Sequence, residues 1–457
     1  MTTDRAALTA GYLDEVARHG ATGADLLSVI PSTGLLDTDP HLSRPLFLGR
    51  AEAEQLNSDL QHVRAALASL PAKLYDGDLT AFARDSGLTD SQISAVLRSR
   101  AGRPVTEVTQ LARGDLYPQP SGLRLLEFNM GSAIAGIDNA DLCRAMLRYP
   151  LLREFARTHR LGYVDTMSAE IDLIFGETGF ARDSYPMVAM VAWSNLYKVY
   201  GSTLHKMARR WRAKGLDAHA CHIGQLKVRN GKVMLRGRQV DIIFRIFIIE
   251  QMLLPEGPAL MDPILDAVAR GQVAMFTPFD SELFGSKAPL AMISEQRNRH
   301  LFSPAELEAI DRVLPWTRMV RPGPVTLEDG STVDLFDYAT SHAADLVLKP
   351  TLLHGGVGVL PGWHPDTTEQ VWRDELGKAM GGPYVLQRRV VPDPELCPGE
   401  NGELIPWIVT WGVFTFPTGY GGGWARAFPV SSGREVTRAG TGLLYGSTLV
   451  AGWGTGR

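Results

Sequence analysis

Apolar residues recur at helical spacing through most of the first hundred residues. A period of three to four residues is typical of an amphipathic helix with one face against a core. The same period returns twice further along the chain. Asp90 stands where a side-chain cap would begin one of these helices. The spacing predicts helices over 4–19, 50–69, 78–86, 90–100, 140–159 and 202–214.

Short apolar runs separated by turn residues begin near Val108 and predict strands. LARGDLYP and LRLLEFNM flank Pro118–Gly122, which indicates a hairpin. Asn230–Gly231 indicates a second, tight hairpin. VDIIFRIFII reads as a buried strand running toward a helix. The sequence from Val108 onward is therefore predicted to combine hairpins with buried strands.

A later block begins near Gly271 and mixes both kinds of element. QVAMFTPF, DLVLKP and PYVLQRRVV predict strands, and a hairpin around Gly419–Gly423 would join IVTWGVFTF to GGWARAFPV. SKAPLAMIS predicts the start of a helix, and SPAELEAIDRVL predicts a helix capped by serine. The expected fold is α+β, with mixed sheets and flanking helices. It divides into a mostly helical region 1–105, a metal- and substrate-binding region 106–270 and a nucleotide-binding region 271–457.

Composition argues against nucleic-acid-binding, membrane-spanning and disulfide-rich proteins. A net charge of −4 over 457 residues gives no electrostatic argument for a nucleic-acid or anionic-membrane partner. No apolar run is long enough to cross a bilayer. The three cysteines are far apart, so neither a disulfide framework nor a zinc cluster is expected. We predict a cytoplasmic protein and leave a homodimer open.

The first candidate site lies on the hairpin around Pro120. Residues two apart on a strand share a face, so Glu127 and Asn129 project together. A turn at Pro120 would place Arg113 opposite Glu127, with Asp115 diagonal to it. Asp115, Glu127 and Asn129 would then offer magnesium the oxygen ligands that it prefers. The alternative is a solvated strand face with ordinary polar residues.

The second candidate site is built around lysines and glycines. An apolar strand delivers Lys349, and a flexible segment with Gly355, Gly356 and Gly358 follows. Glycines let backbone N–H groups approach phosphate oxygens, and a lysine adds positive charge. Lys287 follows Gly285–Ser286 where a helix begins. The alternatives are a simple turn and a surface lysine.

Two further segments are candidates for nucleotide or substrate contact. PYVLQRRVV suits a strand whose main chain meets adenine, with Gln387, Arg389 and Val390 beside the nucleotide. The alternative is that the side chains of Arg388 and Arg389 are solvated. Arg426 follows a glycine run on a strand, where it would contact substrate or phosphate, or form a structural salt bridge.

Together these residues resemble the circularly permuted ATP-grasp ligases, the group that includes glutathionylspermidine synthetase and the eukaryotic glutathione synthetases. The resemblance covers roughly residues 105–430. Five motifs appear in the family's order: Arg113-Gly-Asp115, Glu127-Phe-Asn129, Gly285-Ser-Lys287, Val347-Leu-Lys349-Pro and Tyr384-Val-Leu-Gln387. The metal-binding E-x-N motif precedes the phosphate lysine, whereas it follows that lysine in unpermuted enzymes.

The resemblance implies a role for each of these residues. Asp115, Glu127 and Asn129 would hold Mg²⁺. Lys287 and Lys349 would contact ATP phosphates under the glycines of 355–358, and Arg113 would face the acyl phosphate or the incoming carboxylate. The chain departs from the pattern in two places. Arg388 stands where the adenine hinge usually has an acid. His354 lies near the position at which glutathione synthetases have an additional metal-binding glutamate.

The implied reaction is ligation of a carboxylate to an amine. ATP would phosphorylate a small carboxylate, such as an amino acid or peptide, to give an acyl phosphate and ADP. An amine would then attack the activated carbonyl. Such catalysis depends mainly on positioning and charge neutralisation. The alternatives are a catalytically silent nucleotide-binding protein of this fold and a small-molecule kinase.

Overall fold

The structure is a computed structural model that describes residues 4–31, 36, 40–433 and 442–453. The N-terminal stretch is mostly helical, as its apolar spacing predicts. The α-helices are α1 (Arg5–Arg18), α2 (Gly23–Leu27), α3 (Arg50–Leu74), α4 (Leu79–Asp85), α5 (Asp90–Ser99), α6 (Asn139–Met146), α7 (Pro150–Thr158), α8 (Thr166–Thr178), α9 (Ser194–Ala213), α10 (Gly257–Ala269), α11 (Asp280–Gly285), α12 (Lys287–Ser294), α13 (Pro304–Val313), α14 (Leu335–Ser341) and α15 (Glu369–Ala379). Short 3-10 helices are η1 (Arg182–Ser184), η2 (Ile223–Gln225), η3 (Ile249–Leu253), η4 (Gln296–Leu301), η5 (Ala343–Asp345) and η6 (Val430–Ser432).

The largest sheet of the described residues is mainly antiparallel and carries the candidate metal hairpin at one edge. Its order is β1-β21-β20-β19-β2-β3, with β18 paired to β19 and β4 paired to β21. The strands are β1 (Leu46–Leu48), β2 (Ala112–Gln119), β3 (Gly122–Met130), β4 (Leu161–Gly162), β18 (Glu395–Pro398), β19 (Leu404–Phe416), β20 (Gly419–Pro429) and β21 (Leu444–Ala451). The sheet takes strands from all three predicted regions, and the division into those regions stays a prediction.

A second sheet is parallel and was not expected from the sequence. Its order is β11-β10-β5-β6, and each neighbouring pair runs in the same direction. The strands are β5 (Met187–Ala192), β6 (Asp217–His222), β10 (Ile242–Arg245) and β11 (Ala274–Phe276). Beside it lies a small antiparallel sheet of β7 (Leu226–Arg229), β8 (Lys232–Leu235) and β9 (Arg238–Gln239). With a parallel sheet added, the fold is mixed α/β.

The third large sheet carries the candidate phosphate lysine. It is antiparallel, with the order β12-β17-β15-β16. Its strands are β12 (Thr317–Met319), β15 (Leu346–Pro350), β16 (Leu360–Pro361) and β17 (Tyr384–Arg388), and the separate hairpin nearby is β13 (Pro324–Thr326) with β14 (Thr332–Asp334). A core of its own, which includes the fully buried Trp372 of α15, packs against this sheet.

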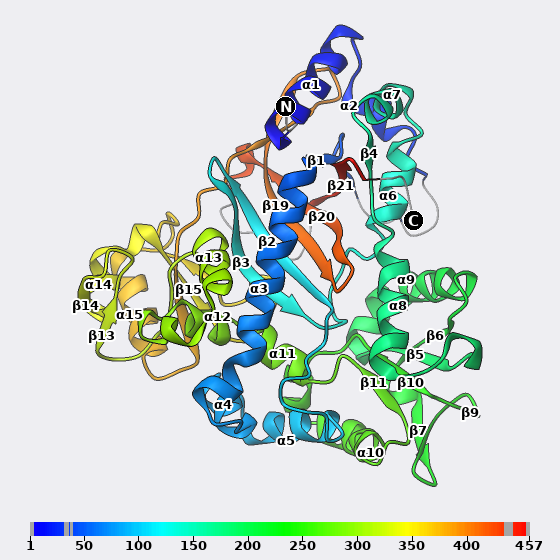
Figure 1. Cartoon of the computed structure of the whole chain (residues 1–457), viewed down its shortest axis with the longest axis vertical. Coiled ribbons are helices and arrows are strands. Elements are labelled where there is room, and N and C mark those ends of the chain that lie inside the picture. Colours follow the sequence, from blue (N-terminus) through cyan, green and yellow to red (C-terminus); the bar gives the residue numbers. More distant parts are fainter. Residues whose placement is uncertain (1–3, 32–35, 37–39, 434–441, 454–457) are drawn as a thin grey trace.

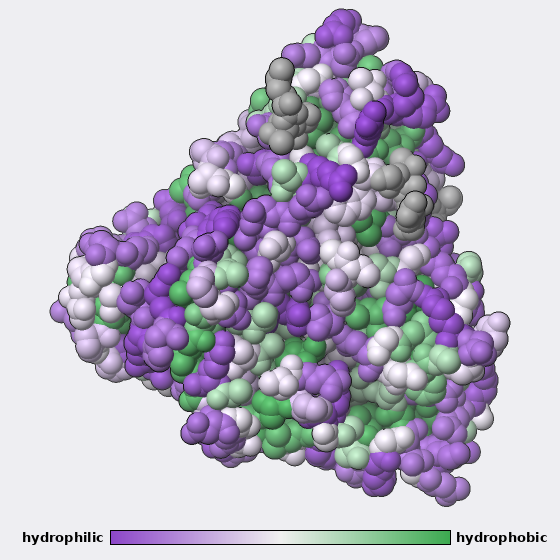
Figure 2. Space-filling view, viewed as in Figure 1, coloured by the Kyte–Doolittle hydropathy of each residue, from purple (hydrophilic) through white to green (hydrophobic). Residues whose placement is uncertain are grey.

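The elements form a molecule with three corners (Figure 1). One corner holds α1, α2 and α7, a second holds α14 and α15 with β13 and β14, and the third holds the parallel sheet with α8 and α9. The long helix α3 packs against β19, β20 and β21 of the largest sheet. Hydrophilic residues cover most of the visible face (Figure 2). Among the described residues, no helix combines the length and the hydropathy needed to span a bilayer.

Several predicted boundaries are wrong. Thr89, not Asp90, caps α5, because Thr89 and Gln92 form a capping box. The helix predicted over 140–159 is divided into α6 and α7. Pro150 begins α7 and lacks the N–H that a continuous helix would need, and the residue before it is extended.

Two further predictions are confirmed in the main. A hairpin joins IVTWGVFTF to GGWARAFPV, but its turn precedes the glycines of 419–423, because β19 ends at Phe416 and β20 begins at Gly419. VDIIFRIFII contains the buried strand β10, which ends at Arg245, and the helix that follows is the 3-10 helix η3. The hairpins at Pro118–Gly122 and Asn230–Gly231 are confirmed.

Candidate functional site

The hairpin β2–β3 presents its polar residues on one face, but its register differs from the predicted one. Arg113 pairs with Asn129 and Asp115 pairs with Glu127, because the turn pairs Gln119 with Gly122 and an irregularity between Asp115 and Leu116 shifts the pairing by one more residue. A shift by two residues keeps the same side chains on the same face. The two carboxylates of the hairpin therefore lie directly opposite each other, where they would repel without cations.

Arginines surround the Asp115 carboxylate. Arg113 donates to both of its oxygens, over 2.8 and 3.0 Å, and Arg426 of β20 adds an ion pair. Arg113 also donates to the Ala135 carbonyl and lies over the ring of Trp424. Both Arg113 and Asp115 are buried. The predicted repulsion between the hairpin acids is thus relieved at Asp115 by the protein's own cations.

Glu127 faces a second set of cations. Its carboxylate lies 3.6 Å from the ammonium of Lys287. Burial raises the pKa of Glu127, but the charges of Lys287, Arg426 and Lys349 outweigh that effect and hold the pKa well below its usual range. The glutamate is therefore a stable anion at neutral pH.

A close approach between α11 and β3 brings Lys287 to this carboxylate. A Cβ atom at Gly285 would lie only 2.8 Å from the backbone nitrogen of Met130, so a side chain there would push the two elements apart. Lys287 begins α12 two residues later and is itself buried. Its ammonium donates to the Leu353 carbonyl over 3.1 Å. Gly285 thus allows the contact that sets Lys287 beside the hairpin.

Lys349 reaches the same place from β15. Its ammonium donates to the Leu126 carbonyl over 3.2 Å and to Gln387 Oε1 over 2.6 Å. Gln387 in turn donates to Thr317 Oγ over 3.1 Å. Burial lowers the pKa of Lys349 to about 8, and Lys287 adds to that shift although Glu127 opposes it. Lys349 is thus a cation at neutral pH that loses its charge in mildly basic solution.

One pocket is lined by six of the predicted residues, whereas Asn129 lines a separate cavity. The walls of the pocket include two carboxylates and three cationic side chains, which leaves one net positive charge and favours an anionic ligand. The lining residues are Asp115, Tyr117, Leu126, Glu127, Lys287, Lys349, Gly356, Val359, Thr410 and Arg426. Tyr117, Val359 and Thr410 were not predicted, because they carry no charge and Thr410 reaches the site only through its pairing with Arg426 on β20.

The glycine-rich loop between β15 and β16 borders this pocket. Gly355, Gly356 and Gly358 all have φ between 65° and 78°, a left-handed conformation that other residues rarely adopt. The loop begins at Leu353, whose carbonyl accepts from Lys287. The loop therefore needs glycine at these positions, because residues with side chains rarely adopt this backbone conformation.

Three comparisons with known proteins bear on the fold. No protein-family model and no curated protein matches the sequence. Among solved structures, the chain is similar over 98% of both chains to a glutathione synthetase-like effector from Globodera pallida, with a TM-score of 0.54 and 14% identity. The chain shares its overall fold with this protein. At this identity the similarity concerns the fold alone.

Two weaker matches are named after synthetases. A putative γ-glutamylcysteine synthetase from Methylobacillus flagellatus KT is 12% identical, with a TM-score of 0.39 over 88% of this chain and 85% of that one. D-alanyl-alanine synthetase A from Vibrio cholerae O1 biovar eltor is 11% identical, with a TM-score of 0.27 over 55% of this chain and 70% of that one. At these TM-scores neither match adds to the structural argument.

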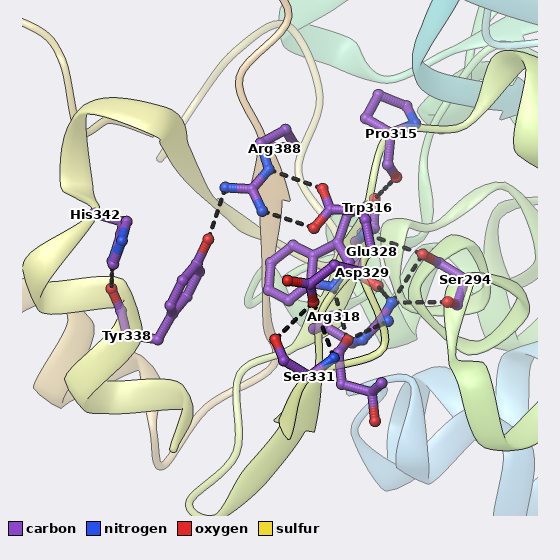
Figure 3. A network of polar contacts seen from close by, with 12 residues as sticks. Ser294, Pro315, Trp316, Arg318, Glu328, Asp329, Ser331, Tyr338, His342 and Arg388 are labelled. Atoms are coloured by element: carbon purple, nitrogen blue, oxygen red, sulfur yellow. Dashed lines mark hydrogen bonds and ion pairs between the residues drawn. The ribbon is translucent and has the colours of Figure 1, made fainter. Parts of the chain in front are cut away.

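The segment predicted to meet adenine has its arginines directed to other partners. Arg388 donates to both oxygens of Glu328, over 2.9 and 2.8 Å, and to the Tyr338 hydroxyl over 3.0 Å (Figure 3). Its guanidinium also lies over the ring of Trp316. Glu328 lies in the turn between β13 and β14 and places a carboxylate beside Arg388.

The other residues predicted to contact the nucleotide differ in exposure. Gln387 is buried and bonded to Lys349 and Thr317, so its side chain supports the lysine. Arg389 lies over the ring of Trp363, and Val390 is buried. Their contact with a nucleotide stays a prediction.

The residues of the pocket fit Mg²⁺ and a nucleotide phosphate. Glu127 is an anion, and Asn129 lies beside it, with its amide nitrogen 3.5 Å from Glu127 Oε1. A carboxylate with a neighbouring amide is an oxygen donor set that Mg²⁺ accepts. Asp115 is the weaker candidate ligand, because arginines already occupy both of its oxygens.

Proposed function

We propose that the chain is an ATP-dependent carboxylate–amine ligase that forms an amide or peptide bond through an acyl phosphate. The observation that best supports this function is the meeting of Lys287, Lys349 and Arg426 around Glu127 in one pocket. These cations come from separate elements. One cation would be enough to form a structural ion pair with Glu127, so the other two remain to be explained. An excess of cations around a metal-binding acid suits the terminal phosphates of ATP.

The chain's own residues would divide the work as follows. Lys287 and Lys349 would bind phosphate oxygens, and the backbone N–H groups of the 355–358 loop would cover them. Arg426 would orient the substrate carboxylate, while Arg113 holds Asp115 in place. Glu127 and Asn129, with Asp115, would hold Mg²⁺. When bound, Mg²⁺ would supply neutralisation of charge on the phosphates.

The substrates would be a small carboxylate, such as an amino acid or peptide, and an amine. Attack of the carboxylate oxygen on the γ-phosphorus forms the acyl phosphate and releases ADP. The amine nitrogen then bonds to the carbonyl carbon, the C–O bond to phosphate breaks, and the nitrogen loses a proton. ADP, phosphate and the amide are the balanced products.

The function is tested by incubating the purified protein and Mg·ATP with a panel of amino acids, small peptides and polyamines. We expect ADP and phosphate in equal amounts, only when both an acid and an amine are present, with the coupled product found by mass. Hydroxylamine should trap the activated acid as a hydroxamate. AMP as the main product would overturn the mechanism. A phosphorylated product without an amine would indicate a kinase, and no turnover with any pair would indicate a silent nucleotide-binding protein.

A further inference from the structure

A second polar cluster lies beside the start of the glycine-rich loop. Glu250 belongs to η3, Glu282 to α11 and His354 to the loop itself. One ligand atom from each of these side chains lies within 4.8 Å of the other two. Glu282 and His354 also line a small cavity together with Asn129 and Gly285. Glu282 and His354 thus share a small cavity, and a ligand atom of Glu250 lies close to both.

Two atoms in this cluster are buried and have no hydrogen-bond partner among the residues that the structure describes: Glu250 Oε2 and His354 Nε2. The imidazole Nε2 is 3.8 Å from Glu250 Oε1, which is beyond hydrogen-bond distance. Glu250 Oε1 instead accepts from the Leu353 N–H over 3.1 Å. A buried polar atom with no partner costs about 1 to 3 kcal/mol, and a shared cation would remove that cost for both residues.

The charges in the cluster also favour a cation. Arg245 forms an ion pair with Glu282, and the Ile249 N–H donates to the other oxygen over 2.8 Å. The cluster thus has two carboxylates and one arginine, which pairs with Glu282, and this leaves one negative charge when the imidazole is neutral.

We propose that Glu250, Glu282 and His354 bind one divalent transition-metal ion that ties the glycine-rich loop to η3 and α11. Imidazole with carboxylates suits Zn²⁺ or Mn²⁺, whereas Mg²⁺ prefers oxygen ligands. The ion is distinct from the one that Glu127 and Asn129 would hold. This site does not depend on the proposed ligase reaction, since its ligands bind the ion without nucleotide.

Calorimetric titration of the full-length, chelator-treated protein with Zn²⁺ and no nucleotide tests the site. We expect one equivalent to bind, with Mn²⁺ weaker and Mg²⁺ much weaker. Glu250→Gln and His354→Ala should each weaken Zn²⁺ binding by about tenfold or more. The matched control is His300→Ala, because His300 is exposed and its ring bonds to the Arg297 carbonyl of its own η4 helix.

Two further measurements keep the result unambiguous. Co²⁺ in place of Zn²⁺ should give a visible absorption band that changes in His354→Ala, because that variant removes the nitrogen ligand. Glu127→Gln should keep Zn²⁺ binding, which separates this site from the pocket. The proposal is overturned if Glu250→Gln and His354→Ala, folded by circular dichroism, bind Zn²⁺ as tightly as the unaltered protein. It also fails if Mg²⁺ displaces Zn²⁺ at equal concentration.

Discussion

The pocket on β2–β3 and the inner face of α8 each hold a glutamate, and they shift its pKa in opposite directions. Glu127 lies among lysines and arginines, which hold its pKa well below the usual range. Glu170 of α8 is fully buried, and neither of its carboxylate oxygens has a partner among the described residues. Burial raises the pKa of Glu170 to about 8.

Glu127 therefore keeps its negative charge at neutral pH, whereas Glu170 does not carry one. At Glu127, cations offset the loss of hydration, so the anion persists and can attract a metal ion. At Glu170 nothing offsets that loss, so the side chain keeps its proton at neutral pH. The same substitution, Glu to Gln, should therefore have opposite consequences at the two positions.

The largest effect is expected at Glu127. Glu127→Gln keeps the shape of the side chain but removes the charge that would hold Mg²⁺, and Glu127→Ala removes the whole ligand. Either variant should fold yet lower the turnover number by about a thousandfold, as measured by amine-dependent ADP release. Near-normal activity at low millimolar Mg²⁺ would contradict the metal assignment.

A smaller loss is expected at Lys349. Lys349→Ala removes a buried cation beside Glu127 and should lower kcat/KM for ATP by about a hundredfold, close to the value of one charged contact in a closed site. The control is Lys378→Ala, because Lys378 lies on the exposed side of α15 and pairs with Glu375 of the same helix. Unchanged kinetics in Lys349→Ala would make that lysine structural.

Glu170→Gln should stabilise the protein at neutral pH. The unfolded chain loses this proton near the usual pKa of 4.5, whereas the folded protein keeps it up to about pH 8. Stability therefore falls as pH rises between these values, and Gln removes the penalty, worth about 3 kcal/mol at pH 7. Urea denaturation should show a higher midpoint for the variant at pH 7 and equal midpoints at pH 4, with activity unchanged. Equal midpoints at both pH values would show that Glu170 does not hold its proton.

The smallest effect concerns the pH dependence set by Gln387. Lys349 loses its charge as pH rises through about 8, so kcat/KM for ATP should decline above that pH. Gln387→Leu removes an acceptor from the ammonium and should move the decline to lower pH, by about one unit or less. Gln387→Glu should move it to higher pH. Superimposable profiles would show that Gln387 does not influence this lysine.

Much of the candidate site could be predicted because its signals are local. The period of two on β2 and β3 sets Asp115, Glu127 and Asn129 on one face, and this holds although the register was wrong. The apolar run ending at Lys349 predicted a strand, which the structure confirms as β15. Helix caps were harder, since Thr89 and Asp90 are both good capping residues and only the bonded geometry distinguishes them.

The sequence by itself determined the amphipathic helices, the hairpins and the type of residue available for chemistry, because these depend on neighbours a few positions apart. Only the tertiary structure decided which charges meet. Lys349 bonds to Leu126, 223 residues away, and Arg426 bonds to Asp115, 311 residues away. The parallel sheet and the meeting of Glu250, Glu282 and His354 also arise only from packing. Whether a buried glutamate keeps or loses its proton depends on such distant partners, which no local pattern encodes.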